Sequence, residues 1–182
     1  MSLPISAGQW ALDPAHSVVE FSVGHLGISV IRGRFGDVSA QLTAAEDLAG
    51  SSLTAEVAMA SVDTGNEHRD THLRSTDIFN AEEQPTMTFT SSSITDAGDG
   101  RYRVSGELSI NGTTRTEHLD VVFGGTEDNP LDNSTRAGFS ATGRIDRTDY
   151  GIDWNVPLAS GGTMLGSGID LTLDAQLVAS TD

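Results

Sequence analysis

Apolar and polar residues alternate along most of this chain. Polar residues separate Val19, Phe21 and Val23, and the same period of two runs without interruption from Ile169 to Leu177. Alternation of this kind is typical of β-strands that bury one face and expose the other. About eight such segments follow one another, so the pattern predicts an all-β fold of antiparallel strands.

Short turn signals separate the predicted strands. Asn111-Gly112 is the strongest hairpin signal, because both residues tolerate a positive φ, and Asp96–Gly100 has the composition of a second turn. The long alternating segment near the C-terminus would promote aggregation if it were an exposed edge strand, which favours a closed sheet. We therefore predict a single domain, residues 1–182 with an ordered core at about 10–178, that forms an antiparallel β-barrel of about eight strands.

One stretch, Gly65–Ser75, breaks the alternation and tolerates a helix. Thr64 and Glu67 have the spacing of a capping box, in which a hydroxyl and a carboxylate satisfy backbone donors at the start of a helix. Asp70 and Arg74 are spaced to form an ion pair across one turn. We expect this short helix to cover one end of the barrel as a plug or lid.

The interior of such a barrel is just wide enough for side chains or for one slim ligand. Several candidate inward positions hold small residues, which would leave space, whereas large neighbours such as Phe21, Phe35, Phe89 and Phe139 could fill it. The residues alone leave a filled core and an open cavity as equal alternatives. The small residues are Gly33, Ala55, Gly106, Ala137, Ala141, Gly143 and Ala175.

Composition excludes several classes of partner and site. The chain has 26 acidic and 10 basic residues, all of the latter arginine, and its net charge is -16. This charge repels phosphate backbones and anionic lipid surfaces, so we expect no nucleic-acid partner. Cysteine is absent, which removes disulfides and zinc–thiolate sites. We also expect no transmembrane segment and a cytoplasmic location for the chain as written, or a periplasmic or secreted one if a signal was removed.

The chain shows no recognisable catalytic constellation. His68 and His72 are spaced as a metal pair, but no third ligand is evident and an H-E-x-x-H motif is absent, so we predict no metal site. A G-x-S-x-G elbow is also absent, and we predict no catalytic residue. His25 is the best single candidate for a polar contact to a ligand, although a histidine bonded to backbone is an equal alternative.

The chain resembles the YceI-like family, the lipocalin-like polyisoprenoid-binding proteins of bacteria. The resemblance covers about Trp10 to Val178 in one register, and its most specific part is the long run at Ser61–Ser75. The matching stretches are W-A-L-D-P-A-H-S at Trp10–Ser17, F-S-V-G-H-L-G at Phe21–Gly27, R-G-R-F-G at Arg32–Gly36, S-V-D-T-G-N-E-H-R-D-T-H-L-R-S at Ser61–Ser75, Q-P-T-M-T-F at Gln84–Phe89, R-A-G-F at Arg136–Phe139 and D-Y-G-I-D-W-N at Asp149–Asn155.

The resemblance implies a lipocalin-like antiparallel barrel with one short helix and an apolar tunnel. The implied function is binding, transport or storage of a long-chain isoprenoid lipid, such as a quinone tail or a polyprenyl phosphate, with no other cofactor and with a homodimer as a possible assembly. The alternatives are an enzyme acting on the same ligand, with His25 or His72 as general base, and a stress-related interaction module with a filled core. The expected ligand-binding residues are Val19, Phe21, Val23, His25, Leu26, Ile31, Phe35, Leu53, Val57, His72, Phe79, Phe89, Leu108, Phe139, Ile145, Trp154 and Leu171.

Overall fold

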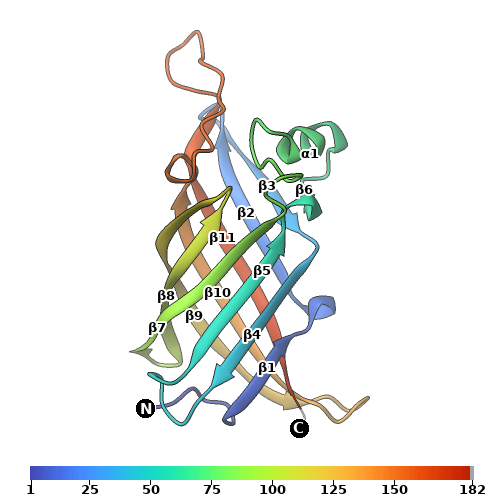
Figure 1. Ribbon diagram of the computed structural model, residues 1–182, viewed down its shortest axis with the longest axis vertical. Coiled ribbons are helices and arrows are strands. Elements are labelled where there is room, and N and C mark those ends of the chain that lie inside the picture. The colour runs from blue at the N-terminus through green and yellow to red at the C-terminus, as the bar shows by residue number, and fades with distance from the viewer. Residues whose placement is uncertain (181–182) are drawn as a thin grey trace.

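A tall, closed wall of antiparallel strands forms the body of the molecule (Figure 1). The computed structural model describes residues 1–180. The end of the barrel that carries the N-terminus and the last residues of the final strand is called the lower end here, and the end beside the helix is the upper end. The strands are β1 Gly8–Leu12, β2 Val18–His25, β3 Ser29–Phe35, β4 Val38–Ala44, β5 Ser52–Ala58, β6 Val62–Asp63, β7 Thr86–Gly98, β8 Arg101–Ile110, β9 Thr113–Asp128, β10 Thr135–Asp146 and β11 Leu165–Ala179.

The eleven strands occupy eight positions around the barrel, because three of these positions each hold two short strands placed end to end. The pairs β1 and β2, β3 and β4, and β5 and β6 follow one another along the chain and along the barrel. Short 3-10 helices interrupt two of them, η1 at Pro14–His16 and η2 at Met59–Ser61. Gly36 and Asp37 separate β3 from β4. The prediction of an antiparallel barrel of about eight strands is confirmed.

Strand β11 closes the barrel. Along one edge it pairs with β10, and along the other it pairs first with β2 and then with β1. Ser17 and Gln176 join the wall where β1 gives way to β2, since the Gln176 backbone N–H donates to Ser17 Oγ at 3.0 Å. The backbone N–H of Asp13 also donates to the carbonyl of Gln176 at 2.8 Å. The wall therefore stays hydrogen-bonded across the break.

The two predicted turns are both present. Asn111 and Gly112 have φ values of 51° and 74° and connect β8 to β9. Gly98, Asp99 and Gly100 also have positive φ and connect β7 to β8. Glycine and asparagine adopt this left-handed backbone at little cost, which explains why composition locates these hairpins in the sequence.

The helix α1 spans Glu67–Arg74 and lies at the upper end beside β3 and β6 (Figure 1). Its N-cap is Asn66, whose side-chain oxygen accepts from the backbone N–H of Arg69 at 3.0 Å. The predicted capping box of Thr64 with Glu67 is therefore wrong. The hydroxyl of Thr64 instead donates to Asp70, because the chain turns at Gly65 and brings Thr64 back over the first helical turn.

The predicted ion pair between Asp70 and Arg74 is also wrong. Asp70 is buried, and its carboxylate accepts from both the backbone N–H and the hydroxyl of Thr64. Arg69 donates from Nε to the same hydroxyl and from Nη2 to the Thr64 carbonyl. Arg74 reaches Glu67 at 3.4 Å instead. The buried carboxylate thus ties the helix to the strand that precedes it, which spacing along a helix does not predict.

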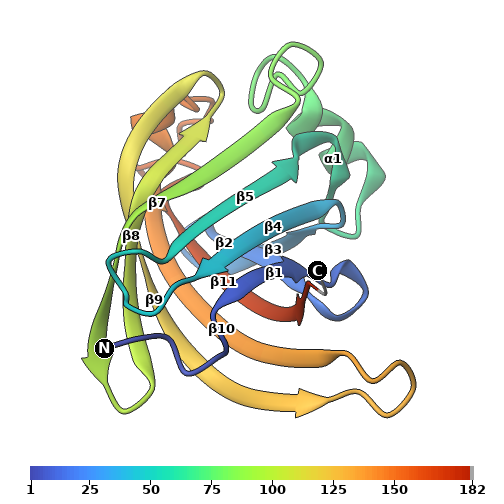
Figure 2. The ribbon, with the colours of Figure 1, turned by 60° about the horizontal axis from the view of Figure 1, so that its bottom comes forward.

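The packed core begins earlier in the sequence than residue 10, where it was predicted to begin. Leu3 and Trp10 are both buried, and the indole N–H of Trp10 donates to the carbonyl of Ser6 at 3.0 Å. The carbonyl of Met1 accepts from the backbone N–H of Leu48 at 3.0 Å. Figure 2 shows this N-terminal segment running across the lower end of the barrel before it enters β1. Within residues 1–180, no helix is long and apolar enough to cross a membrane.

Candidate ligand cavity

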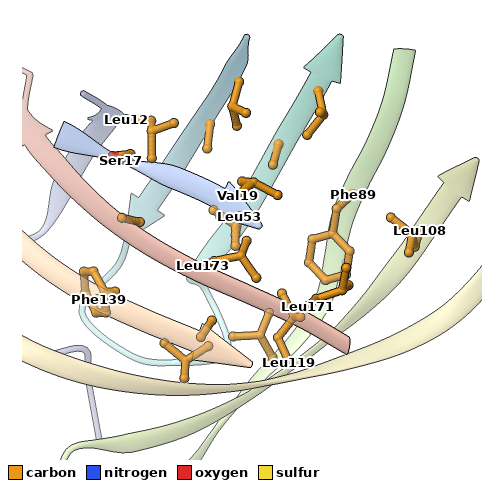
Figure 3. Close-up of a pocket in the computed structure, with 18 of the residues that line it drawn as sticks. Leu12, Ser17, Val19, Leu53, Phe89, Leu108, Leu119, Phe139, Leu171 and Leu173 are labelled. Atoms are coloured by element: carbon orange, nitrogen blue, oxygen red, sulfur yellow. The ribbon is translucent and has the colours of Figure 1, made fainter. Parts of the chain in front are cut away.

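A cavity of about 200 Å³ lies inside the barrel. Its surface is almost entirely carbon, and the side chains in Figure 3 are hydrocarbon apart from the hydroxyl of Ser17. Leu53, Leu119 and Leu171 come from three different strands and all line this space. An apolar cavity of this kind offers water no hydrogen-bond partners, so it suits a hydrocarbon ligand.

The small inward residues divide into two groups. A Cβ at Gly106 would lie 2.5 Å from the Phe89 ring, and one at Gly143 would lie 2.7 Å from a methyl group of Leu119. The ring of Phe21 covers Gly33 even more closely. The space beside these three glycines is therefore already filled by a neighbouring side chain. Three of the four alanines, Ala55, Ala141 and Ala175, by contrast, line the cavity, whereas Ala137 is fully buried and does not.

The aromatic rings pack along the wall. Phe123 and Phe139 are cross-strand partners on β9 and β10, with ring centroids 5.4 Å apart. Phe21 and Phe35 lie on the adjacent strands β2 and β3 with centroids 5.5 Å apart. Because each of these pairs joins neighbouring strands, the rings leave space along the axis of the barrel. The structure thus combines the two alternatives that the sequence left open, with a filled wall beside the glycines and a cavity beside the alanines.

The lower end of the cavity is closed by leucine side chains. Leu3 from the N-terminal segment lines the cavity together with Leu12, Leu42 and Leu177. Leu3 belongs to no strand, and it reaches this position because the segment before β1 folds over the end of the barrel. The N-terminal segment is therefore part of the site.

Polar groups at the upper end are hydrogen-bonded within the protein, including Glu117, which lines the cavity. The hydroxyl of Tyr150 donates to the carboxylate of Glu117 at 2.7 Å. Burial raises the pKa of the Tyr150 hydroxyl well above its usual range, and the neighbouring Glu117 raises it further. Tyr150 is fully buried, so this hydrogen bond satisfies a polar group that has no access to water.

Arg147 is a buried cation at the same end. Its Nη1 donates to the carbonyls of Ile152 and Trp154, and its Nε donates to the carbonyl of Gly166 at 2.9 Å. Burial lowers the pKa of the Arg147 guanidinium. These contacts commit the guanidinium to the backbone, where it holds the segment after η3 (Arg147–Tyr150) against the start of β11.

The structure brings nine of the seventeen predicted residues together around the cavity. They lie on seven different strands, and their side chains share the inner face that the alternation predicts. Contact of these side chains with a ligand remains a prediction. The nine are Val19, Phe35, Leu53, Val57, Phe89, Leu108, Phe139, Ile145 and Leu171.

The other eight predicted residues do not line the cavity. The strands β2 and β3 continue beyond it to their hairpin, so residues near that hairpin lie above the cavity. Another part of the group lies on α1 or follows it. The ring of His72 on α1 stacks edge-on against Trp154 at 4.7 Å, and Phe79 contacts the ring of Phe35. The eight residues are Phe21, Val23, His25, Leu26, Ile31, His72, Phe79 and Trp154.

Sequence reasoning also missed several lining residues. Leu119, Val121 and Leu173 follow the same alternation as the predicted ones, and Leu12 and Leu42 lie on short strands of the wall, so a complete reading of the inner face would have included them. Leu3 is different, because no periodic pattern surrounds it. Within the described part of the chain, no group of three His, Cys, Asp or Glu side chains is arranged to hold a metal ion.

Comparisons with known proteins agree with this architecture. The sequence model of the YceI-like domain matches residues 10–177. A UPF0312 protein of Staphylococcus epidermidis is 38% identical over 165 residues, which is 90% of this chain and 94% of that protein. The crystal structure of the Campylobacter jejuni YCEI protein is 30% identical, with a TM-score of 0.72 over 87% of this chain and 90% of the other.

A third protein shares the fold at lower identity. A polyisoprenoid binding domain from Saccharophagus degradans, implicated in plant cell wall breakdown, has a TM-score of 0.64 and 17% identity, covering 94% of this chain and 98% of that one. The family match covers the barrel except for the first two residues of β1, the last two of β11 and the N-terminal segment. This chain therefore belongs to the YceI-like family.

Proposed function

We propose that this protein binds the hydrocarbon chain of an isoprenoid lipid, such as a quinone tail or a polyprenyl phosphate, inside its barrel, and carries or stores it. The observation on which the proposal depends is the cavity with an almost purely carbon surface. Membership of the YceI-like family supports the proposal, as does the fold shared with a domain described as polyisoprenoid-binding.

Hydrophobic transfer alone can supply the affinity. Each buried CH₂ contributes about 0.8 kcal/mol, so an isoprene unit of about five carbons contributes roughly 3 kcal/mol. Association costs about 4–15 kcal/mol in lost freedom. Several buried units therefore exceed that cost without a polar anchor, which agrees with a cavity that has almost no polar surface.

The size of the cavity limits how much chain it can hold. Its volume of about 200 Å³ is below the range of roughly 300–1,000 Å³ that is typical of sites for drug-sized ligands. A long isoprenoid chain must then leave part of its length outside the present cavity or widen it. We expect affinity to rise with tail length and to level off once the cavity is full.

Isothermal titration calorimetry with quinones of increasing tail length measures the affinity for each quinone and tests this expectation. Equal affinity for a quinone without a tail would contradict the proposal. The variant Ala55→Phe places a ring in the cavity and should abolish tail-dependent binding, because Ala55 lines the cavity. Thr54→Phe, on the outer face of the same strand, is the matched control and should bind as the wild type does.

Binding is preferred over turnover for a specific reason. An enzyme of this fold would need a general base near the bound chain. The two histidines considered for that role, His25 and His72, do not line the cavity. The side chain of His72 is instead engaged with Asp77 at 3.2 Å and with the ring of Trp154. Glu117 and His118 do border it, but the Glu117 carboxylate is hydrogen-bonded to Tyr150 and the His118 ring to Ser105.

A further inference from the structure

Two loops lie side by side at the upper end of the barrel. The turn between β2 and β3 meets the loop that precedes β11, since the backbone N–H of Leu26 donates to the carbonyl of Met164 at 2.7 Å. The N–H of Met164 in turn donates to the carbonyl of Val156 at 2.8 Å. Figure 1 shows the second loop projecting beyond the rest of the barrel. Residues 24–31 and 154–166 are called the upper tip here.

The upper tip carries a cluster of exposed apolar side chains. Ile28 is 84% exposed, Val30 48%, Val156 42% and Leu26 39%. These four are the majority of the seven large apolar residues that are exposed in the described part of the chain. A concentration of this kind at one site indicates a surface that binds something, whereas single exposed apolar residues do not.

The upper tip also lacks charge in a strongly acidic protein. No charged residue occurs from 21 to 31 or from 154 to 169, although the chain has 26 acidic residues and a net charge of -16. The nearest charged neighbours in sequence are Glu20, Arg32, Asp153 and Asp170. The two loops that meet in space therefore carry no charged side chain between them.

We propose that the upper tip inserts into the surface of a lipid bilayer whose headgroups carry no net charge. The exposed apolar side chains come from both loops, three from the β2–β3 turn and the start of β3 and one, Val156, from the projecting loop. Side chains of this kind can enter the boundary between headgroups and acyl chains without a complementary groove. A stable protein interface needs about 1,200–2,000 Å² of matched surface, which a projecting loop does not present. A second copy of the chain would also bring two strongly negative bodies together.

This inference rests on the proposed function, because an isoprenoid ligand resides in bilayers. It adds the place where the protein meets its source of ligand. The strand β2 connects the upper tip to the cavity, since it runs from His25 in the tip to Val19 in the cavity wall.

Sedimentation with phosphatidylcholine vesicles tests the proposal. The wild-type protein should bind, and Ile28→Asp should weaken binding on the order of tenfold, because it places a charge where an apolar side chain enters the bilayer. Leu131→Asp is the matched control, since Leu131 is 91% exposed but lies in the loop between β9 and β10 at the opposite end. This control should bind as the wild type does. Adding anionic lipid to the vesicles should reduce binding, because the protein is negative.

The remaining outcomes separate this proposal from the proposed function. Absence of wild-type binding to these vesicles, or equal loss in both variants, would overturn the bilayer proposal, as would a wild-type dimer that Ile28→Asp dissociates. Ile28→Asp should still bind a quinone in solution, because Ile28 does not line the cavity. Ala55→Phe should still bind vesicles while losing the quinone. Loss of vesicle binding by Ala55→Phe would contradict a tip that acts independently of the cavity.

Discussion

Inside this barrel, glycine and alanine have opposite effects on packing. Gly33, Gly106 and Gly143 admit the side chain of a neighbour into the space above the backbone, so the wall becomes solid there. Ala55 and Ala141 keep a methyl group that neighbours do not cover, and they line the cavity. A glycine inside a strand thus marks close approach of another group, as is usual for this residue.

The variant Gly33→Ala should destabilise the protein. Its new methyl group would collide with the ring of Phe21 and with Thr64, and overpacking of this kind typically costs about 1–3 kcal/mol. Gly36→Ala is the control, because a Cβ there meets only the carbonyl of Ser61 at 3.8 Å. Chemical denaturation should show a lower free energy of unfolding for Gly33→Ala than for Gly36→Ala. Equal values would mean that Phe21 moves aside without cost.

Residue-level prediction succeeded for the direction of side chains and failed for their height in the barrel. The alternation correctly placed Val19, Leu53 and Leu171 on the inner face, where they line the cavity. It placed Phe21 and Val23 on the same face, yet both lie above the cavity. Periodicity reports which side of a strand a residue occupies, but the end of a cavity depends on contacts between strands that are distant in sequence.

Among the elements of the fold, the segment before β1 contributes to the barrel wall at its lower end. Its Leu3 side chain is buried at the lower end of the cavity, and its Met1 carbonyl is bonded to the loop that follows β4. The segment has neither a strand nor a helix of its own. Its position is therefore maintained by the buried Leu3 side chain, the packing of Ile5 and two hydrogen bonds, from Leu48 to the Met1 carbonyl and from Trp10 to the Ser6 carbonyl, which is a small number of contacts for a segment that closes a cavity.

The variant Leu3→Ala should open the lower end of the cavity. We expect a loss of stability of about 2–5 kcal/mol, as for other buried leucines, and faster release of a bound quinone in stopped-flow displacement. Ile5→Ala is the control in the same segment, because Ile5 packs against the core without lining the cavity. An unchanged release rate in Leu3→Ala would show that the ligand leaves by another route.

Strands and hairpins could be predicted from sequence, whereas end closures could not. Turn composition located the hairpin at Asn111 and Gly112, because the backbone there needs a positive φ. The helix was located, but its N-cap is Asn66 and its buried carboxylate Asp70 bonds to Thr64. Local spacing predicted a capping box at Thr64, and the hydrogen bonds of Thr64 to Asp70, six residues away, show why that prediction is wrong.

For the whole molecule, two opposing electrostatic effects determine how the stability of the folded state changes with pH. The net charge of -16 at pH 7 destabilises the compact state through self-repulsion, and the fall in negative charge on acidification relieves it. Several carboxylates, however, are held charged by local hydrogen bonds. Donors from the Ser134 hydroxyl and backbone lower the pKa of Asp132 to about 2, and a hydrogen bond from His16 lowers the pKa of Asp13.

These effects predict a maximum of stability in mildly acidic solution. A carboxylate whose pKa is lower in the folded state stabilises it fully above its unfolded value near 3.8, and that contribution is lost as pH falls toward about 2. We expect the melting temperature to rise from pH 7 to about pH 5 and to fall below about pH 4. Thermal unfolding followed by circular dichroism at low protein concentration measures both limbs.

In the variant Asp132→Asn, the melting temperature should fall less steeply below about pH 4, because the variant lacks one carboxylate with a depressed pKa. Asp99→Asn is the control, since Asp99 is exposed in the turn between β7 and β8 and asparagine tolerates its positive φ. A melting temperature that keeps rising down to pH 2 would be incompatible with stabilisation by these charged carboxylates.

The way β11 closes the barrel has a consequence for how the protein is made. A ribosome delivers β11 after every other strand, yet β10, β2 and β1 all need it as a pairing partner. Until translation reaches this strand, the nascent chain is an open sheet with two unpaired margins, one at β10 and the other at β1 and β2. Messages broken before the codons of β11 should therefore yield aggregation-prone fragments that quality-control proteases clear, and not a weakened but folded barrel.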